Sequence, residues 1–120
     1  MSIASNRAAL VALLATASVR AFDYAPKSLP TPCAVVGFPT SYDAHDTFTS
    51  TAMIVAIVLY VGYGDGRAAE DELEALIDTV VAAVEADSDY SVTTVDEFGL
   101  VENSAGQPTA LSCTVSVSVL

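Results

Sequence analysis

The chain has 120 residues, which is the size of one domain and enough to bury a hydrophobic core without disulfides or metals. Apolar residues make up 52% of it and charged residues 16%, a composition that excludes a disordered chain. Four Lys and Arg residues stand against fifteen Asp and Glu residues, which gives a formal net charge of −11. This balance argues against binding to nucleic acids and to anionic membranes, because both need clustered basic side chains.

The opening segment is rich in alanine and places Leu10 and Leu14 at helical spacing. We expect an amphipathic helix that ends near Tyr24, because Pro26 disfavours helical geometry in the residue before it. A secretory signal fits less well, since only Arg7 precedes the apolar stretch. The sequence therefore predicts a soluble cytoplasmic product.

The middle of the chain alternates between extended and polar segments. Three prolines in residues 26–32 indicate a stiff, extended connector. Residues 33–38 predict a first strand that stops at Pro39. The polar residues 40–50 show no periodicity and predict a loop. Residues 49–63 predict the longest strand, because β-branched side chains dominate it.

That long strand is apolar on both faces, and each face needs cover. One face carries Met53, Val55, Ile57, Leu59 and Val61, and the other carries Ile54, Ala56, Val58 and Tyr60. A single layer of helices cannot cover both. We therefore predict that a subunit interface involves Ile54, Val55, Ile57 and Val58.

Residues 67–86 predict an amphipathic helix after a glycine-rich turn at residues 62–66. Its apolar positions follow helical spacing closely: Leu73, Leu76, Ile77, Val80, Val81 and Val84. Glu70, Asp71 and Glu72 fall in its first turns, where the helix dipole favours negative charge. A solvated acidic face is a simpler interpretation than a metal or acid site, because no His or Cys joins them.

The end of the chain predicts a β-hairpin. Residues 90–95 form its first strand, which could continue past Gly99 to Val101 with a bulge at the glycine. Residues 103–106 predict the turn, and strict alternation over residues 111–119 predicts the last strand. The resulting fold class is α+β, a four-stranded, mainly antiparallel sheet packed on two helices. The element order is α-β-β-α-β-β, in a single domain over residues 1–120.

A search for catalytic chemistry finds little. The single histidine, His45, could act with Asp43 or Asp46 in a triad-like arrangement, but a lone loop histidine beside acids is more often solvated. The turn at residues 62–66 matches neither a dinucleotide-binding nor a Walker motif. We predict no catalytic residue, no cofactor and no metal.

The two cysteines, Cys33 and Cys113, are too few for a disulfide scaffold and have no metal-ligand companions nearby. Both fall in predicted strands. They are expected to be buried thiols, with a disulfide as the alternative if their strands are neighbours.

The chain resembles the tail terminator (tail completion) proteins of long-tailed bacteriophages, particularly those that infect actinobacteria. The resemblance covers nearly the whole chain. It rests on the Ala-rich opening up to Ala21-Phe22-Asp23-Tyr24, the connector Leu29-Pro30-Thr31-Pro32, the strand Ala34-Val35-Val36-Gly37-Phe38-Pro39, the strand Ile54-Val55-Ala56-Ile57-Val58-Leu59-Tyr60-Val61, the acidic helix from Arg67 and the closing Ser/Val strand.

The resemblance implies a structural virion protein in the tail or neck, assembled in the host cytoplasm. Such a protein forms a homo-hexameric ring on the tail tube, ends tube polymerisation and joins the tail to the head connector protein. DNA passes through its channel without specific binding, and no membrane takes part. The polar loop, with Tyr42, Asp43, His45 and Asp46, is the predicted contact with the tube or the connector.

Three alternatives stay open. The first is another head–tail connector, such as a neck or stopper protein. The second is a small intracellular domain that binds a ligand or peptide on its sheet. The third is a small enzyme that uses His45 with Asp43 or Asp46.

Overall fold

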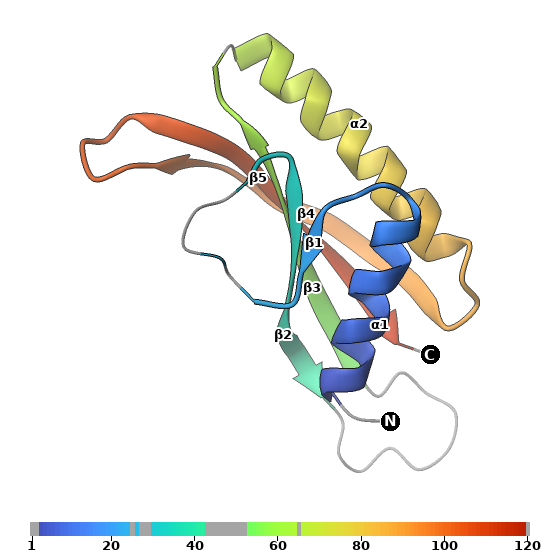
Figure 1. The fold of residues 1–120 in the computed structure, drawn as a ribbon. Coiled ribbons are helices and arrows are strands. Elements are labelled where there is room, and N and C mark those ends of the chain that lie inside the picture. Colours follow the sequence, from blue (N-terminus) through green and yellow to red (C-terminus); the bar gives the residue numbers. More distant parts are fainter. Residues whose placement is uncertain (1–2, 25, 27–29, 43–52, 65, 120) are drawn as a thin grey trace.

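The computed structural model describes residues 3–24, 26, 30–42, 53–64 and 66–119. Its elements are, in chain order, α1 (Ile3–Thr16), β1 (Ala21–Phe22), β2 (Cys33–Tyr42), β3 (Met53–Gly62), α2 (Gly66–Glu85), β4 (Tyr90–Glu102) and β5 (Pro108–Val119). Figure 1 shows one sheet with both helices on the same side of it.

The sheet has five strands in the order β1-β2-β3-β5-β4. The predicted four-stranded sheet and the predicted element order are therefore wrong, because β1 adds a strand between α1 and β2. This strand pairs in parallel, Ala21 with Ala34 and Phe22 with Val35, and makes the sheet mixed. The other strand pairs are antiparallel. Two residues are too few to produce a periodic pattern, so sequence spacing does not show β1.

The first helix is shorter than predicted, ending at Thr16 and not near Tyr24. Ser18 adopts the left-handed conformation, with φ of 64°. The backbone N–H of Val19 then donates to the carbonyl oxygen of Leu14 over 3.0 Å. This arrangement is the Schellman motif, which satisfies the last helical carbonyls and turns the chain away. The turn frees the next residues to form β1.

The second strand is longer than predicted, because β2 passes through Pro39 and ends at Tyr42. Register shifts between Val36 and Pro39, and between Pro39 and Ser41, accommodate the proline. Bulges tolerate proline because it has no N–H to donate to a regular ladder. Of the predicted loop over residues 40–50, residues 40–42 thus belong to β2, and the rest lies outside the described residues.

The centre of the sheet is the pairing of β3 with β5. Ten consecutive pairs run without a shift from Met53–Val119 to Gly62–Ala110. Alternate side chains therefore point to opposite faces. The helices cover the face that carries these buried residues: Met53, Val55, Ile57, Leu59, Val61, Cys113, Val115, Val117 and Val119.

The predicted helix over residues 67–86 and the predicted C-terminal hairpin are confirmed. Buried positions on α2 include Leu73, Val80 and Val84. The strands β4 and β5 pair in antiparallel through a turn in which Gly106 has φ of 79°. Figure 1 shows the tip of this hairpin extending beyond the helices.

Replacing Ile57 by Ala tests the assignment of faces on β3. Ile57 is fully buried under the helices, whereas its neighbour Val58 points to the other face and is partly exposed. We expect Ile57→Ala to lower the free energy of unfolding by about 2–5 kcal/mol, since it leaves a cavity. Val58→Ala should lower it by about 1 kcal/mol or less. Urea titration measures both, and equal losses would contradict the assignment.

Replacing Ser18 by Gly tests the end of α1. A left-handed residue with a side chain is disfavoured by roughly 1–2 kcal/mol, and glycine avoids this penalty. We expect Ser18→Gly to raise the free energy of unfolding by roughly 0.5–1 kcal/mol after the entropy of the unfolded chain is counted. Ala12→Gly, at an exposed position within α1, is the control and should lower the free energy of unfolding. A loss of stability in Ser18→Gly would refute the proposed helix end.

Candidate functional site

The face of the sheet opposite the helices, here called the outer face, carries partly exposed apolar side chains. On β3 they are Ile54, Ala56, Val58 and Tyr60, each next to a residue that is buried on the helix side. Val35 on β2 pairs with Val58 and continues the strip. On β5 the same face is polar, with Ser112, Thr114, Ser116 and Ser118 in the register of β3. The described helices contact only the other face.

The four residues predicted at a subunit interface divide between the two faces. Val55 and Ile57 are fully buried in the core beneath the helices. Ile54 and Val58 lie on the outer face and are partly exposed. Of these four residues, only Ile54 and Val58 can thus contact another molecule without unfolding the subunit.

The predicted partner-contact loop falls mostly outside the described residues. Asp43, His45 and Asp46 lie there. Tyr42 is the last residue of β2, and its backbone pairs with Met53.

The described edges of the sheet are poor templates for another strand. On β4, register shifts interrupt the ladder near Thr93 and near Glu97. On β2, Pro39 offers no N–H, and the carbonyl oxygen of Val36 accepts hydrogen bonds from Arg7 Nη2 at 3.1 Å and Nε at 3.3 Å. Bulges, prolines and occupied backbone groups all reduce edge-to-edge pairing. A contact through a face is therefore favoured over strand addition.

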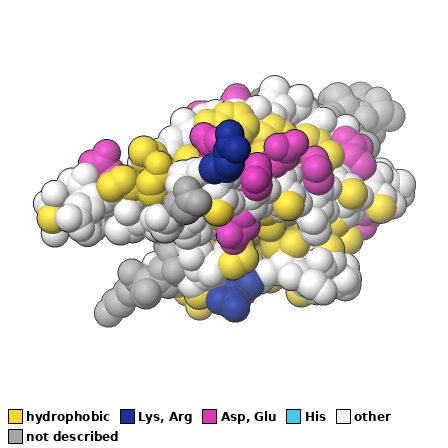
Figure 2. All heavy atoms as spheres, turned by 90° about the horizontal axis from the view of Figure 1, so that it is seen from above, with side chains coloured by type: hydrophobic (Ala, Val, Ile, Leu, Met, Phe, Trp, Pro, Cys, Tyr) yellow, Lys and Arg dark blue, Asp and Glu magenta, His cyan; other side chains and the backbone are white. Residues whose placement is uncertain are grey.

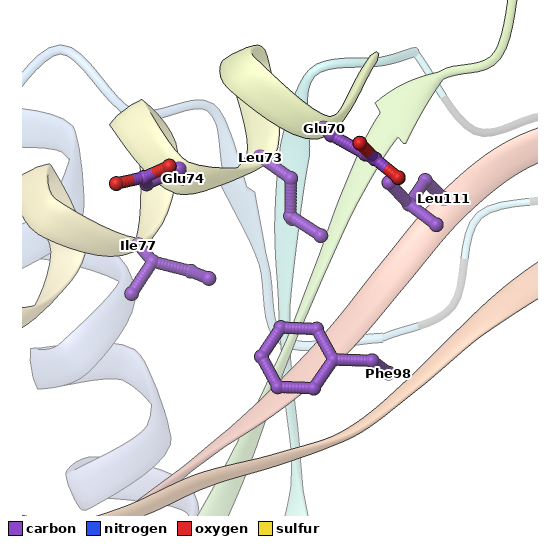
Figure 3. A pocket seen from close by; sticks show the side chains of 6 residues that line it. All are labelled: Glu70, Leu73, Glu74, Ile77, Phe98 and Leu111. Carbon is purple, nitrogen blue, oxygen red and sulfur yellow. The ribbon is translucent and has the colours of Figure 1, made fainter. Parts of the chain in front are cut away.

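A second surface lies on the helix side, where an apolar groove separates α2 from the β4–β5 hairpin. The groove has a volume of about 370 Å³ and is lined by Glu70, Leu73, Glu74, Ile77, Phe98 and Leu111. Figure 3 shows the Phe98 ring below the side chains of Leu73 and Ile77, with Leu111 beside them. Phe98 is 61% exposed and its neighbour Leu100 is 47% exposed. Such large exposed apolar side chains at a groove are typical of binding surfaces.

A bulge in β4 places Phe98 in this groove. Asp96 pairs with Thr114 and Gly99 with Ser112, so three steps on β4 match two on β5. The extra residue is Glu97, with φ of 55°, and its carboxylate accepts a hydrogen bond of 3.2 Å from Thr114 Oγ1. The sequence predicts a bulge at the neighbouring Gly99 but does not indicate a role for Phe98. An aromatic residue beside the predicted bulge was the available signal.

Acidic side chains lie along the α2 side of the groove. Glu70 and Glu74 line it from α2, and Asp71 and Glu72 are exposed on the same helix. Figure 2, which looks down on the end where α2 begins, shows acidic side chains next to hydrophobic ones and few basic side chains. The predicted solvated acidic face of α2 is confirmed, and it borders an apolar surface.

The two cysteines are buried free thiols, as predicted. Cys33 pairs with Tyr60 on the outer face, whereas Cys113 pairs with Leu59 on the helix side. Their strands are separated by β3, which places them about 10 Å apart, too far for a disulfide. Burial raises the pKa of Cys113 to about 11, and the nearby Asp96 adds to this shift. Burial also raises the pKa of Cys33, and Arg20 partly opposes the change.

Over the part of the chain that the structure describes, no three His, Cys, Asp or Glu side chains are grouped to hold a metal ion. Within the same residues, none of the helices has the length and apolar character needed to cross a bilayer.

No protein-family model matches the chain, and no curated protein matches it. The comparisons thus give no enzyme family for this chain. The family resemblance remains one of sequence pattern alone.

The thiols provide a test of burial and of pH dependence. The thiolate is the reactive form, so raised pKa values and burial should both slow thiol–disulfide exchange with a reagent. We expect both cysteines of the folded protein to react with Ellman's reagent at pH 8 far more slowly than after denaturation in urea.

The stability of the fold should also depend on pH through Cys113. Because the folded pKa of Cys113 lies above its usual value of 9.0, its contribution to stability is complete below pH 9 and falls towards pH 11. Rapid reaction of the folded protein, or stability that rises over this range, would contradict the buried thiols.

Proposed function

We propose that this chain is a structural subunit that assembles through its outer face into a closed ring, and that it serves as a tail terminator of a long-tailed phage. One observation carries the assembly: the apolar strip formed by Val35, Ile54, Ala56, Val58 and Tyr60 is partly exposed and packs against neither helix. Burying an aliphatic side chain fully stabilises an assembly by about 1.5–3 kcal/mol. The strip is therefore a favourable contact surface.

The geometry favours a face contact over an edge contact. The described edges of β2 and β4 are interrupted by bulges and a proline, so growth by strand pairing is disfavoured. If one subunit sets its outer face against a different surface of the next, the contact is heterologous. Such contacts close into rings when the rotation between subunits allows it.

The charge of the chain fits a channel for DNA. With a net charge of −11, a ring of this chain is acidic as a whole, and an acidic lumen would repel phosphates and let DNA slide. A role at the end of a tail tube rests on the sequence resemblance described above. A neck or stopper protein would share the ring and the charge, and it differs only in where it binds.

The ring can be tested by replacing an outer-face residue with lysine. We expect native mass spectrometry to show six copies, either for the protein alone or after mixing with the tail tube protein encoded near its gene. Val58→Lys should remove the ring because it places a charge within the apolar strip. Ala75→Lys is the matched control, since Ala75 is exposed on α2 and carries the same change of charge.

Circular dichroism should show that both variants are folded. A ring that survives in folded Val58→Lys would overturn assembly through the outer face. A hexamer that does not bind tube ends but binds the head connector would instead favour the neck or stopper role. A persistent monomer or dimer in the wild-type protein would overturn the ring itself.

A further inference from the structure

We propose that the groove between α2 and the β4–β5 hairpin binds a helical segment of another protein, one that presents a large apolar side chain flanked by Lys or Arg. The inference does not depend on ring formation. It rests on the apolar lining of the groove, on the charge at its rim and on the bulge that interrupts the β4 edge beside it.

The apolar part of the groove is preorganised. Leu73 is nearly fully buried, and Ile77 and Leu111 are partly buried against the core. Phe98 stands on the opposite side and is 61% exposed. The bulge at Glu97 holds this position through the hydrogen bond from Thr114. A volume of about 370 Å³ accommodates one or two large side chains from a partner.

The charge at the rim selects a basic partner. Glu70 and Glu74 are one helical turn apart, and both line the groove. Side chains four residues apart lie on the same helix face, so both carboxylates border the groove from α2 with a four-residue spacing. Lys or Arg residues four apart on a partner helix match this spacing. A basic group can also lie over the exposed ring of Phe98.

The partner should be helical, because the edge strand β4, which carries Phe98, is interrupted by the bulge at Glu97 and is a poor template for an extended peptide. An extended peptide would leave its own backbone groups without partners, whereas a helix satisfies them internally. A second copy of this chain fits this groove poorly, since the chain has only four Lys and Arg residues and no two of them lie four residues apart.

The test uses a library of synthetic 15-residue helical peptides as the probe. One face of each peptide carries Leu or Phe, and the flanking positions four residues apart carry Lys, Ser or Glu. We expect immobilised protein to enrich peptides with Lys at the flanks. For the best peptide, Phe98→Ala should weaken binding roughly tenfold or more, as for an aromatic hot spot. Replacing Glu70 and Glu74 together by Gln should weaken it and reduce its dependence on salt.

The matched control is the pair Asp71→Gln and Glu72→Gln, which removes the same charge from exposed positions of α2 that do not line the groove. This control should keep most of the binding. The proposal is overturned if no peptide is enriched, if Glu-flanked peptides bind as well as Lys-flanked ones, or if Phe98→Ala has no effect. A change of oligomeric state in Phe98→Ala without loss of peptide binding would equally overturn it and favour a second copy as the occupant.

The two proposals can fail separately. Val58→Lys disrupts the outer face and leaves the groove intact, so its peptide binding should match that of the wild-type protein. Phe98→Ala should weaken peptide binding and leave the outer face unchanged, because Phe98 is on the helix side of the sheet.

Discussion

The unbroken pairing of β3 with β5 is the constraint on which the rest of the structure depends. Ten residues of each strand stay in register, so every side chain between Met53 and Gly62 has a fixed face. Both helices then pack on the face where β3 and β5 are apolar together. On the other face, apolar β3 lies beside a β5 that carries Ser and Thr. The register shifts of the sheet lie in the pairing of β2 with β3 and of β4 with β5, on either side of this regular centre.

Because the helices cover one face of the sheet and leave the other open, the molecule has two separate candidate contact surfaces. The outer face presents aliphatic side chains next to hydroxyl groups and depends on shape for its specificity. The groove presents an aromatic ring on one side and two carboxylates on the other, so its specificity depends on charge as well as on shape. Because the sheet lies between them, occupation of one surface does not block the other. The two proposals are therefore compatible, since each assigns a contact to a different side of the sheet.

Much of this fold is predictable from periodicity, and the exceptions have physical causes. The helical spacing of α2 and the strict alternation of β5 predict these two elements correctly, because a regular helix or strand buries side chains at a constant interval. The end of α1 is missed because Ser18, a residue with a side chain, adopts a left-handed conformation in which glycine is usual. On β4, two bulges change which residues face the helices, so Val92, Val95 and Phe98 are spaced by three residues and not by the two of a regular strand. The groove depends on this change in which β4 side chains face the helices. The sequence pattern alone does not predict the change.

The bulge at Glu97 also restricts how the length of the hairpin can vary during evolution. Side chains alternate with a period of two, so removing one residue from the outer half of β4 would turn Leu100 and its neighbours to the opposite side. Removing one residue from each strand would keep their pairing and only shorten the tip, which packs against neither helix. Related sequences should therefore differ in this region by even numbers of residues, or gain or lose a single residue only together with the bulge itself.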